Sequence, residues 1–143
     1  MENILISACL LGVRCRYDAN SVPRVDVARL SEKYNLIPIC PEIYGGLETP
    51  RTPSERVGDR VLMKDGRDVT ENFIRGAEEA YRLAILFSCR KAILKERSPS
   101  CGNGEIYDGS FSGKTTFRDG VTAEYLKARG IEVFGESELE KFI

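Results

Sequence analysis

Short apolar runs alternate with amphipathic stretches along the chain, and this alternation predicts its elements. Four apolar runs are typical of buried strands, at 3–7, 36–40, 91–95 and 131–134. Apolar residues at helical spacing predict helices over 25–34, 70–88, 119–129 and 137–142. Asp26 is a candidate cap at the start of the first helix, and Gly130 is a candidate cap at the end of the third.

Segments rich in turn-forming residues separate these elements. Two of them, 41–59 and 96–118, are long enough that we expect functional loops. Within 60–69 the pair Asp65-Gly66 favours a tight turn, which predicts a hairpin. Strands that alternate with helices imply right-handed crossovers and a parallel sheet. We therefore expect residues 1–143 to form a single α/β domain: a small three-layer, Rossmann-like domain with a mostly parallel four-stranded sheet plus a hairpin.

The composition narrows the possible chemistry. The chain has no histidine, which excludes Ser-His-Asp and Cys-His catalysis and every histidine-containing metal site. The formal net charge of −1 argues against a nucleic-acid partner or a membrane surface, since both need a cationic excess. A local basic cluster, Arg14, Arg16 and Arg24, keeps a nucleic-acid partner from being excluded. The N-terminal segment shows no signal-peptide pattern, so we expect a cytoplasmic protein with reduced thiols.

Any soft-metal site must therefore rest on cysteine. Five cysteines are present: Cys9, Cys15, Cys40, Cys89 and Cys101. Cys9, Cys40 and Cys101 follow three predicted strands, at the edge of a parallel sheet where ligands bind. These three thiolates suit an iron–sulfur cluster or another thiophilic metal, with one position left open for substrate. The alternative is that they are ordinary buried cysteines, because free cysteine is among the most buried residue types.

Cys15 lies between Arg14 and Arg16, and we expect these two cations to lower the pKa of its thiol. It is a candidate fourth ligand, a redox partner of Cys9, or an exposed thiol without a role. Cys89 follows the long helix and is expected in the core.

Polar residues near these cysteines are candidates for catalysis and binding. Glu42, two residues after Cys40, is a candidate general acid or base, and otherwise a solvated loop residue. Arg51 is a candidate cation for an anionic or carbonyl substrate, and otherwise part of a surface ion pair.

Small residues flank the same positions. Gly45 and Gly46 either let the backbone approach a ligand closely or simply turn the chain. Ser98 and Ser100 lie beside Cys101, where their hydroxyls can donate to sulfur or substrate, or only organise the turn.

Several motifs in the same order resemble the thiouracil desulfurase (TudS) family, which was long catalogued only as a bacterial domain of unknown function. They are Ser7-Ala8-Cys9-Leu10-Leu11-Gly12, Arg16-Tyr17-Asp18, Cys40-Pro41-Glu42, Gly45-Gly46-Leu47, Pro50-Arg51 and Ser98-Pro99-Ser100-Cys101-Gly102. The resemblance runs over almost the whole chain.

The resemblance implies a [4Fe–4S] cluster held by Cys9, Cys40 and Cys101, with one iron free to bind the sulfur of a small thiolated base such as 2-thiouracil. It also implies that Glu42 transfers a proton and that Ser98 positions the substrate or helps its protonation, with release of sulfide and no net electron transfer. Arg51, Ser100, Gly45 and Gly46 would contact the substrate. The alternative function is a non-catalytic metal- or cluster-binding module that serves sensing, transfer or structure.

Overall fold

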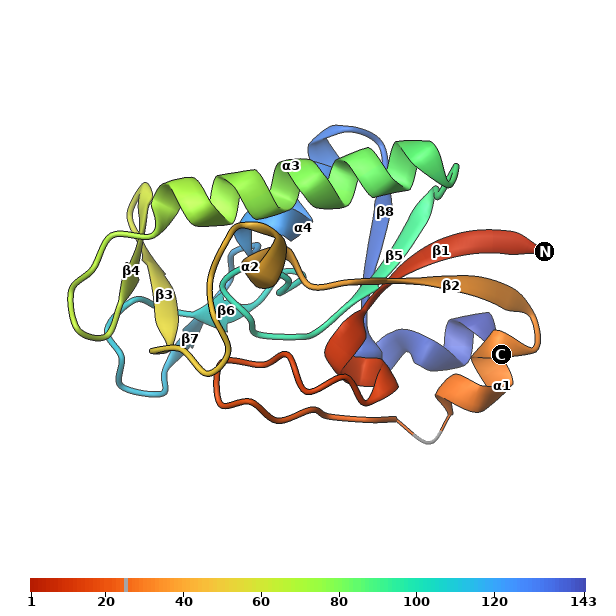
Figure 1. Cartoon of the computed structure of the whole chain (residues 1–143), viewed down its shortest axis with the longest axis horizontal. Coiled ribbons are helices and arrows are strands. Elements are labelled where there is room, and N and C mark those ends of the chain that lie inside the picture. The colour runs from red at the N-terminus through yellow and green to blue at the C-terminus, as the bar shows by residue number, and fades with distance from the viewer. Residues whose placement is uncertain (25) are drawn as a thin grey trace.

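Four parallel strands form the central sheet of the computed structural model, which describes residues 1–24 and 26–143 (Figure 1). They are β1 (Glu2–Ser7), β2 (Tyr34–Ile39), β5 (Lys91–Leu94) and β8 (Glu132–Gly135). Their order in the sheet is β2-β1-β5-β8, and every neighbouring pair is parallel. All four strands therefore end at the same edge. The predicted parallel sheet is confirmed.

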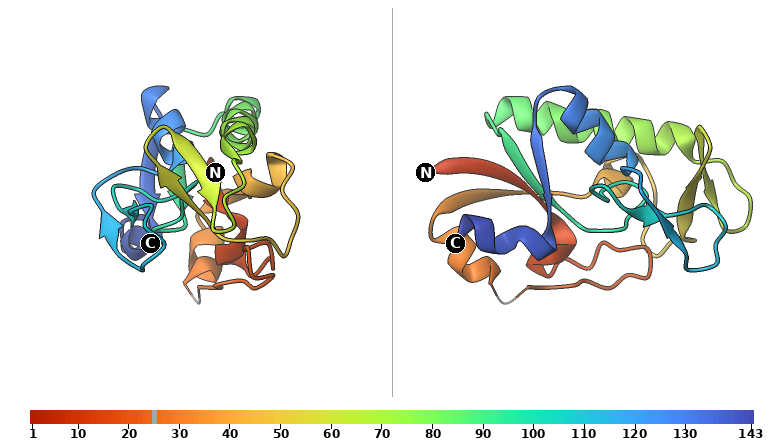
Figure 2. Two further views of the ribbon diagram at one scale, coloured as in Figure 1. Left: turned by 90° about the vertical axis from the view of Figure 1, so that its left-hand side faces the viewer. Right: turned by 180° about the vertical axis from the view of Figure 1, so that it is seen from behind.

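Helices cover both faces of this sheet (Figure 2). On one face lie α3 (Thr70–Leu86) and α4 (Val121–Ala128), and on the other lie α1 (Val27–Ser31) and the 3₁₀ helix η2 (Glu136–Phe142). The alternation of side chains along β1 divides the core accordingly. Leu5 packs in the cluster that contains the α3 and α4 residues, whereas Ile4 and Ile6 pack in the cluster with η2. These are the three expected layers.

A short helix, α2 (Pro41–Tyr44), follows β2 and packs closely on α3. Two glycines permit the contact. A Cβ on Gly76 of α3 would lie 1.9 Å from the carbonyl oxygen of Pro41, and one on Gly45 would lie 2.0 Å from the carbonyl oxygen of Asn72. The position of α2 is thus set by backbone-to-backbone contact with the longest helix.

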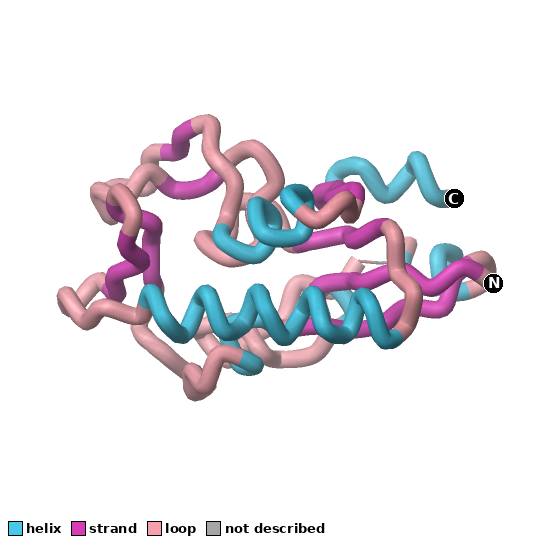
Figure 3. Tube along the Cα trace, turned by 90° about the horizontal axis from the view of Figure 1, so that it is seen from above, coloured by secondary structure: helices cyan, strands magenta, loops and turns pink. Residues whose placement is uncertain are grey.

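Two antiparallel hairpins extend beyond the carboxyl ends of the strands, at the end of the molecule opposite both termini (Figure 3). They pair β3 (Ser54–Val57) with β4 (Arg60–Met63), and β6 (Ile106–Tyr107) with β7 (Thr115–Thr116). The expected hairpin within 60–69 was wrong about the partner strand. Strand β4 pairs along its whole length with β3, whereas Asp68 forms only an isolated bridge with Leu62. The second lies in a segment expected to be a loop.

The remaining differences concern the ends of elements. Tyr34, expected in a helix, starts β2, and Val25 lies outside the described residues. Asp26 occupies the N-cap position of α1 but makes no capping hydrogen bond from its side chain. Gly130, at φ 85°, follows α4 as expected, and Ile131 N–H closes the end of that helix on the Leu126 carbonyl. No described helix has the length and apolar character needed to cross a membrane.

Candidate active site

A cavity of about 390 Å³ lies at the carboxyl edge of the sheet. Its walls come from the segments that follow β1, β2 and β5, together with parts of β3 and of the β6–β7 hairpin. The two segments expected to be functional loops, 41–59 and 96–118, thus both contribute to one site. This is the place where parallel α/β sheets bind their ligands.

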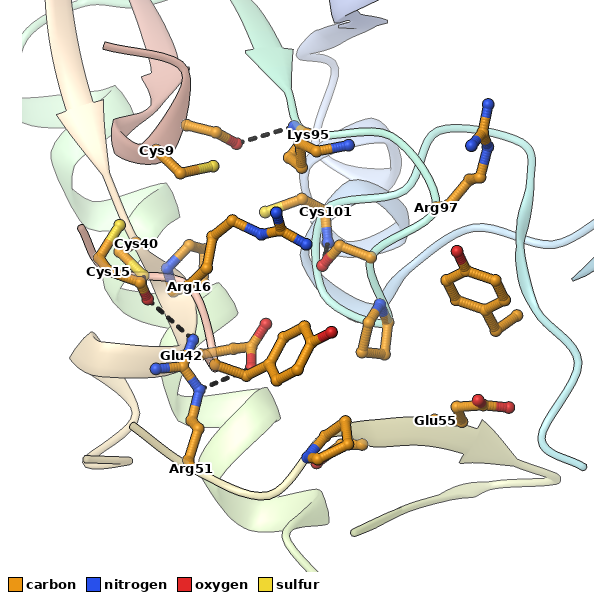
Figure 4. Close-up of a pocket in the computed structure, with 18 of the residues that line it drawn as sticks. Cys9, Cys15, Arg16, Cys40, Glu42, Arg51, Glu55, Lys95, Arg97 and Cys101 are labelled. Carbon is orange, nitrogen blue, oxygen red and sulfur yellow. Dashed lines mark hydrogen bonds and ion pairs between the residues drawn. The ribbon is translucent and has the colours of Figure 1, made fainter. Parts of the chain in front are cut away.

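Three cysteines from three separate segments face this cavity (Figure 4). Cys9 lies in the 3₁₀ helix η1 (Ala8–Leu11), Cys40 occupies the N-cap position of α2, and Cys101 lies in the loop after β5. Burial and the nearby Cys40 raise the pKa of the Cys9 thiol to about 11, and burial raises the pKa of the Cys101 thiol further. The neutral thiol is therefore favoured at Cys9 and at Cys101.

The arrangement distinguishes between kinds of metal centre. A single zinc ion draws its thiolate ligands to about 2.3 Å from one point. Within the described part of the chain, no three or more His, Cys, Asp or Glu side chains form a group that could hold one metal ion. The three thiols instead surround a space. Three cysteines lining one cavity are a donor set that fits a polynuclear iron–sulfur cluster, whose usual ligands are cysteine thiolates.

A fourth cysteine lines the same cavity. Cys15 is only 4% exposed, so it is not the exposed thiol considered above. The pKa of its thiol is raised by a hydrogen bond to Cys40 and by burial, which corrects the expected lowering by its arginine neighbours. The same hydrogen bond lowers the pKa of Cys40 to about 7. As a thiol, Cys40 donates to the carbonyl oxygen of Cys15 at 3.7 Å. Cys89 is buried in the core, as expected.

The carboxylate of Glu42 lies in the cavity wall and forms an ion pair with Arg51, with 3.1 Å between Oε1 and Nε. Burial raises the pKa of the Glu42 carboxyl, and the Arg51 charge opposes this shift. Arg51 also donates from Nη1 to the Glu48 carbonyl and Thr49 Oγ1, and from Nη2 to the Cys15 carbonyl at 3.0 Å. All three nitrogens of Arg51 thus have protein acceptors, and its side chain is 3% exposed.

The two serines near Cys101 have different surroundings. Ser98 lines the cavity, and its Oγ accepts hydrogen bonds from the backbone N–H groups of Ser100 (3.1 Å) and Cys101 (3.0 Å). Ser100 is fully buried, and its Oγ is hydrogen-bonded to Thr122 Oγ1 at 2.8 Å. Ser98 therefore shapes the loop that carries Cys101, while Ser100 anchors that loop to α4.

Three residues expected to contact substrate lie outside the cavity lining. Ser100 faces Thr122, and Gly45 packs against α3. Gly46 has a positive φ of 94° and turns the chain after α2. In the structure, these three residues thus turn the chain or hold segments together, and none of them lines the cavity.

Several lining residues were not among the predicted site residues. Ser7 ends β1, and its Oγ accepts a hydrogen bond from the backbone N–H of Lys95, the residue after β5. Lys95 Nζ is paired with Glu136 Oε2 at 2.9 Å. Both residues lie at carboxyl ends of strands, a signal that the sequence contained. Nothing in the sequence indicated that Glu55 lines the cavity, because β3, the strand that carries it, lies in a segment expected to be a loop.

Comparisons with known proteins agree along the whole chain. A family model described as 2-thiouracil desulfurase matches residues 4–138. The uncharacterized protein YbbK of Bacillus subtilis (strain 168) is 38% identical, over 98% of this chain and 99% of its own. The solved structure of the [4Fe-4S]-dependent thiouracil desulfidase TudS is 44% identical and superposes with a TM-score of 0.94, covering 99% of this chain and 95% of that one.

Proposed function

Since the chain belongs to the 2-thiouracil desulfurase family, we propose that it removes the sulfur of 2-thiouracil or a closely similar thiolated base, with water as the oxygen donor. The net reaction exchanges a thiocarbonyl for a carbonyl and releases hydrogen sulfide, so no external oxidant or reductant is needed. The observation that carries the proposal is the cavity in which three cysteines face the ion-paired carboxylate of Glu42. We place the protein in the cytosol, where its five thiols stay reduced.

We assign Cys9, Cys40 and Cys101 as the residues that would hold a [4Fe–4S] cluster. When bound, the cluster supplies Lewis-acid chemistry that polarises the carbon–sulfur bond and accepts the sulfur. The close packing of α2 on α3 fixes the positions of Cys40 and Glu42 together, because Cys40 precedes α2 and Glu42 lies within it. The chain thereby holds a sulfur ligand and a proton-transfer group in a fixed relation.

Glu42 takes one proton from the attacking water and delivers it to the departing sulfur. The second water proton is lost as the new carbonyl forms and completes the hydrogen sulfide. Arg51 holds one carboxylate oxygen at 3.1 Å, which orients the group and leaves the second oxygen for the water. Because four of its five N–H donors are used within the protein and its side chain is 3% exposed, we assign Arg51 a positioning role instead of substrate contact. Ser98 holds the Cys101 loop through two accepted hydrogen bonds, and its own hydroxyl proton is free to donate into the cavity.

The test is turnover of 2-thiouracil by anaerobically reconstituted protein in water enriched in oxygen-18. We expect one labelled uracil and one sulfide for each 2-thiouracil consumed. Glu42→Gln should retain its iron and lose about 10²- to 10⁴-fold in turnover. Glu48→Gln is the matched control, since this nearby carboxylate is exposed and does not line the cavity.

Two results would contradict the proposal in different ways. Normal turnover by the Glu42 variant would refute its proton-transfer role. A wild-type protein that holds its iron but consumes no thiolated base would instead support the non-catalytic cluster-binding module.

A further inference from the structure

An arginine side chain for which the described residues provide no acceptor lines the same cavity. Arg16 is half-buried, and Figure 4 shows its guanidinium directed into the space that the cysteines surround. Its charge lowers the pKa of the Cys9 thiol against the larger effect of burial, so it lies within electrostatic reach of that sulfur.

Two other cations of the cavity wall have ion-pair partners. Arg51 is paired with Glu42, and Lys95 with Glu136. Within residues 1–24 and 26–143, Arg16 forms no ion pair and donates no hydrogen bond from its side chain. Its guanidinium carbon lies over the Tyr17 ring, 5.6 Å from the centroid. The nitrogen donors are thus left available on the cavity side.

The backbone of Arg16 is, in contrast, held on both sides. Its N–H donates to the Asn20 carbonyl at 3.2 Å, and its carbonyl accepts from the Ala19 N–H at 2.9 Å. The next residue, Tyr17, accepts a hydrogen bond from the backbone N–H of Arg51 at 2.8 Å. A fixed backbone that carries a side chain without protein acceptors is the arrangement expected of a preorganised ligand-binding group.

The chemistry of the guanidinium restricts what it can bind. Arginine has five N–H donors and no acceptor. The ring nitrogens of 2-thiouracil carry hydrogens, so its only acceptors are the sulfur and the second carbonyl oxygen. On the basis of the proposed function, which directs the sulfur toward the cysteines, we propose that Arg16 binds that carbonyl oxygen. The site would therefore select thiolated pyrimidines that carry a second oxo group.

Product-like ligands test this assignment without any chemistry. We would measure the dissociation constants of uracil, 5,6-dihydrouracil and tetrahydropyrimidin-2-one with the reconstituted protein by calorimetry. The last two keep both ring N–H groups and one carbonyl, and only dihydrouracil has the second carbonyl. A charged hydrogen bond to this oxygen should make wild type prefer dihydrouracil by roughly 10- to 100-fold. Arg16→Gln should lose this preference and bind uracil roughly 10- to 100-fold more weakly than wild type.

Arg14→Gln is the matched control, since Arg14 lies in the same loop, is exposed and does not line the cavity. It should retain the wild-type preference. The assignment is overturned if Arg16→Gln keeps that preference, if wild type shows none, or if Arg16→Gln loses its iron together with its binding. Failure of the proposed function is a separate result, because it would appear as absent desulfuration of 2-thiouracil whatever the affinity for uracil.

Discussion

A single added methyl group on α3 should disturb the active site through the backbone of α2. In Gly76→Ala the new Cβ would lie 1.9 Å from the carbonyl oxygen of Pro41, whereas real contacts of this kind stay above 3.0 Å. The two helices must therefore move apart by about 1.1 Å, the difference between these two distances. Both contacting groups are backbone, so a side-chain rotation cannot relieve the clash.

The expected effect on stability is small and the effect on activity is large. Alanine favours a helix interior over glycine by ~1 kcal/mol, while overpacking costs ~1–3 kcal/mol, so a net destabilisation of about 0–2 kcal/mol remains. Cys40 and Glu42 move with α2. A displacement of about 1 Å at reacting groups costs ~100-fold in rate. Turnover should thus fall about 100-fold in a protein that still folds.

Urea unfolding measures the stability, and anaerobic conversion of 2-thiouracil measures the rate, each beside Arg75→Ala. Arg75 is the adjacent exposed residue of the same helix, so its replacement adds helix propensity without any contact with α2. The reasoning is refuted if Gly76→Ala is more stable than wild type by the full propensity gain and turns over normally. Such a result would mean that the contact between α2 and α3 does not position the site.

Three further predictions concern the supporting residues. Hydrogen bonds lower the pKa of Asp68 to about 2 from 3.8, so its contribution to stability is complete above pH 4 and lost as the pH falls through 2. Asp68→Asn should therefore flatten the acid limb of a plot of stability against pH. An unchanged acid limb would contradict this. Ser100→Ala should destabilise by about 1–3 kcal/mol because it leaves the buried Thr122 hydroxyl unpaired, and adding Thr122→Val should recover part of the loss in urea unfolding. Arg51→Met should lower turnover while uracil affinity stays within a few-fold, since Arg51 contacts Glu42 and the backbone; a selective loss of uracil affinity would instead make Arg51 a substrate-binding residue.

The sheet and its helices could be predicted because each of those elements buries apolar residues in a regular pattern. The strand β5, for example, is a continuous apolar run between a helix and a breaker-rich loop, and α3 repeats its small residues every three or four positions. The two hairpins could not be predicted in the same way. The strand β3 (Ser54–Val57) begins with three successive polar residues directly after Pro53, and β6 has only two residues.

The candidate site was predictable as far as the topology dictates it. Parallel strands end at one edge, which brings Cys9, Cys40 and Cys101 to one cavity. The roles of single side chains depend on contacts between distant segments, and the pattern does not contain these. Arg51 was expected to contact a ligand or to form a surface ion pair, but its acceptors come from α2, from Cys15 and from its own loop. Arg16 has no recorded acceptor among the described residues.

Iron and acid-labile sulfide, counted per chain after anaerobic reconstitution, test the central claim most directly. Wild type should hold about four of each, and Cys9→Ala, Cys40→Ala and Cys101→Ala should each lose the cluster together with 2-thiouracil conversion. Cys89→Ala, which removes a buried thiol of the core, is the matched control and should keep both. Zinc in place of iron in wild type, or a full cluster with normal turnover in any of the three cavity variants, would contradict the account.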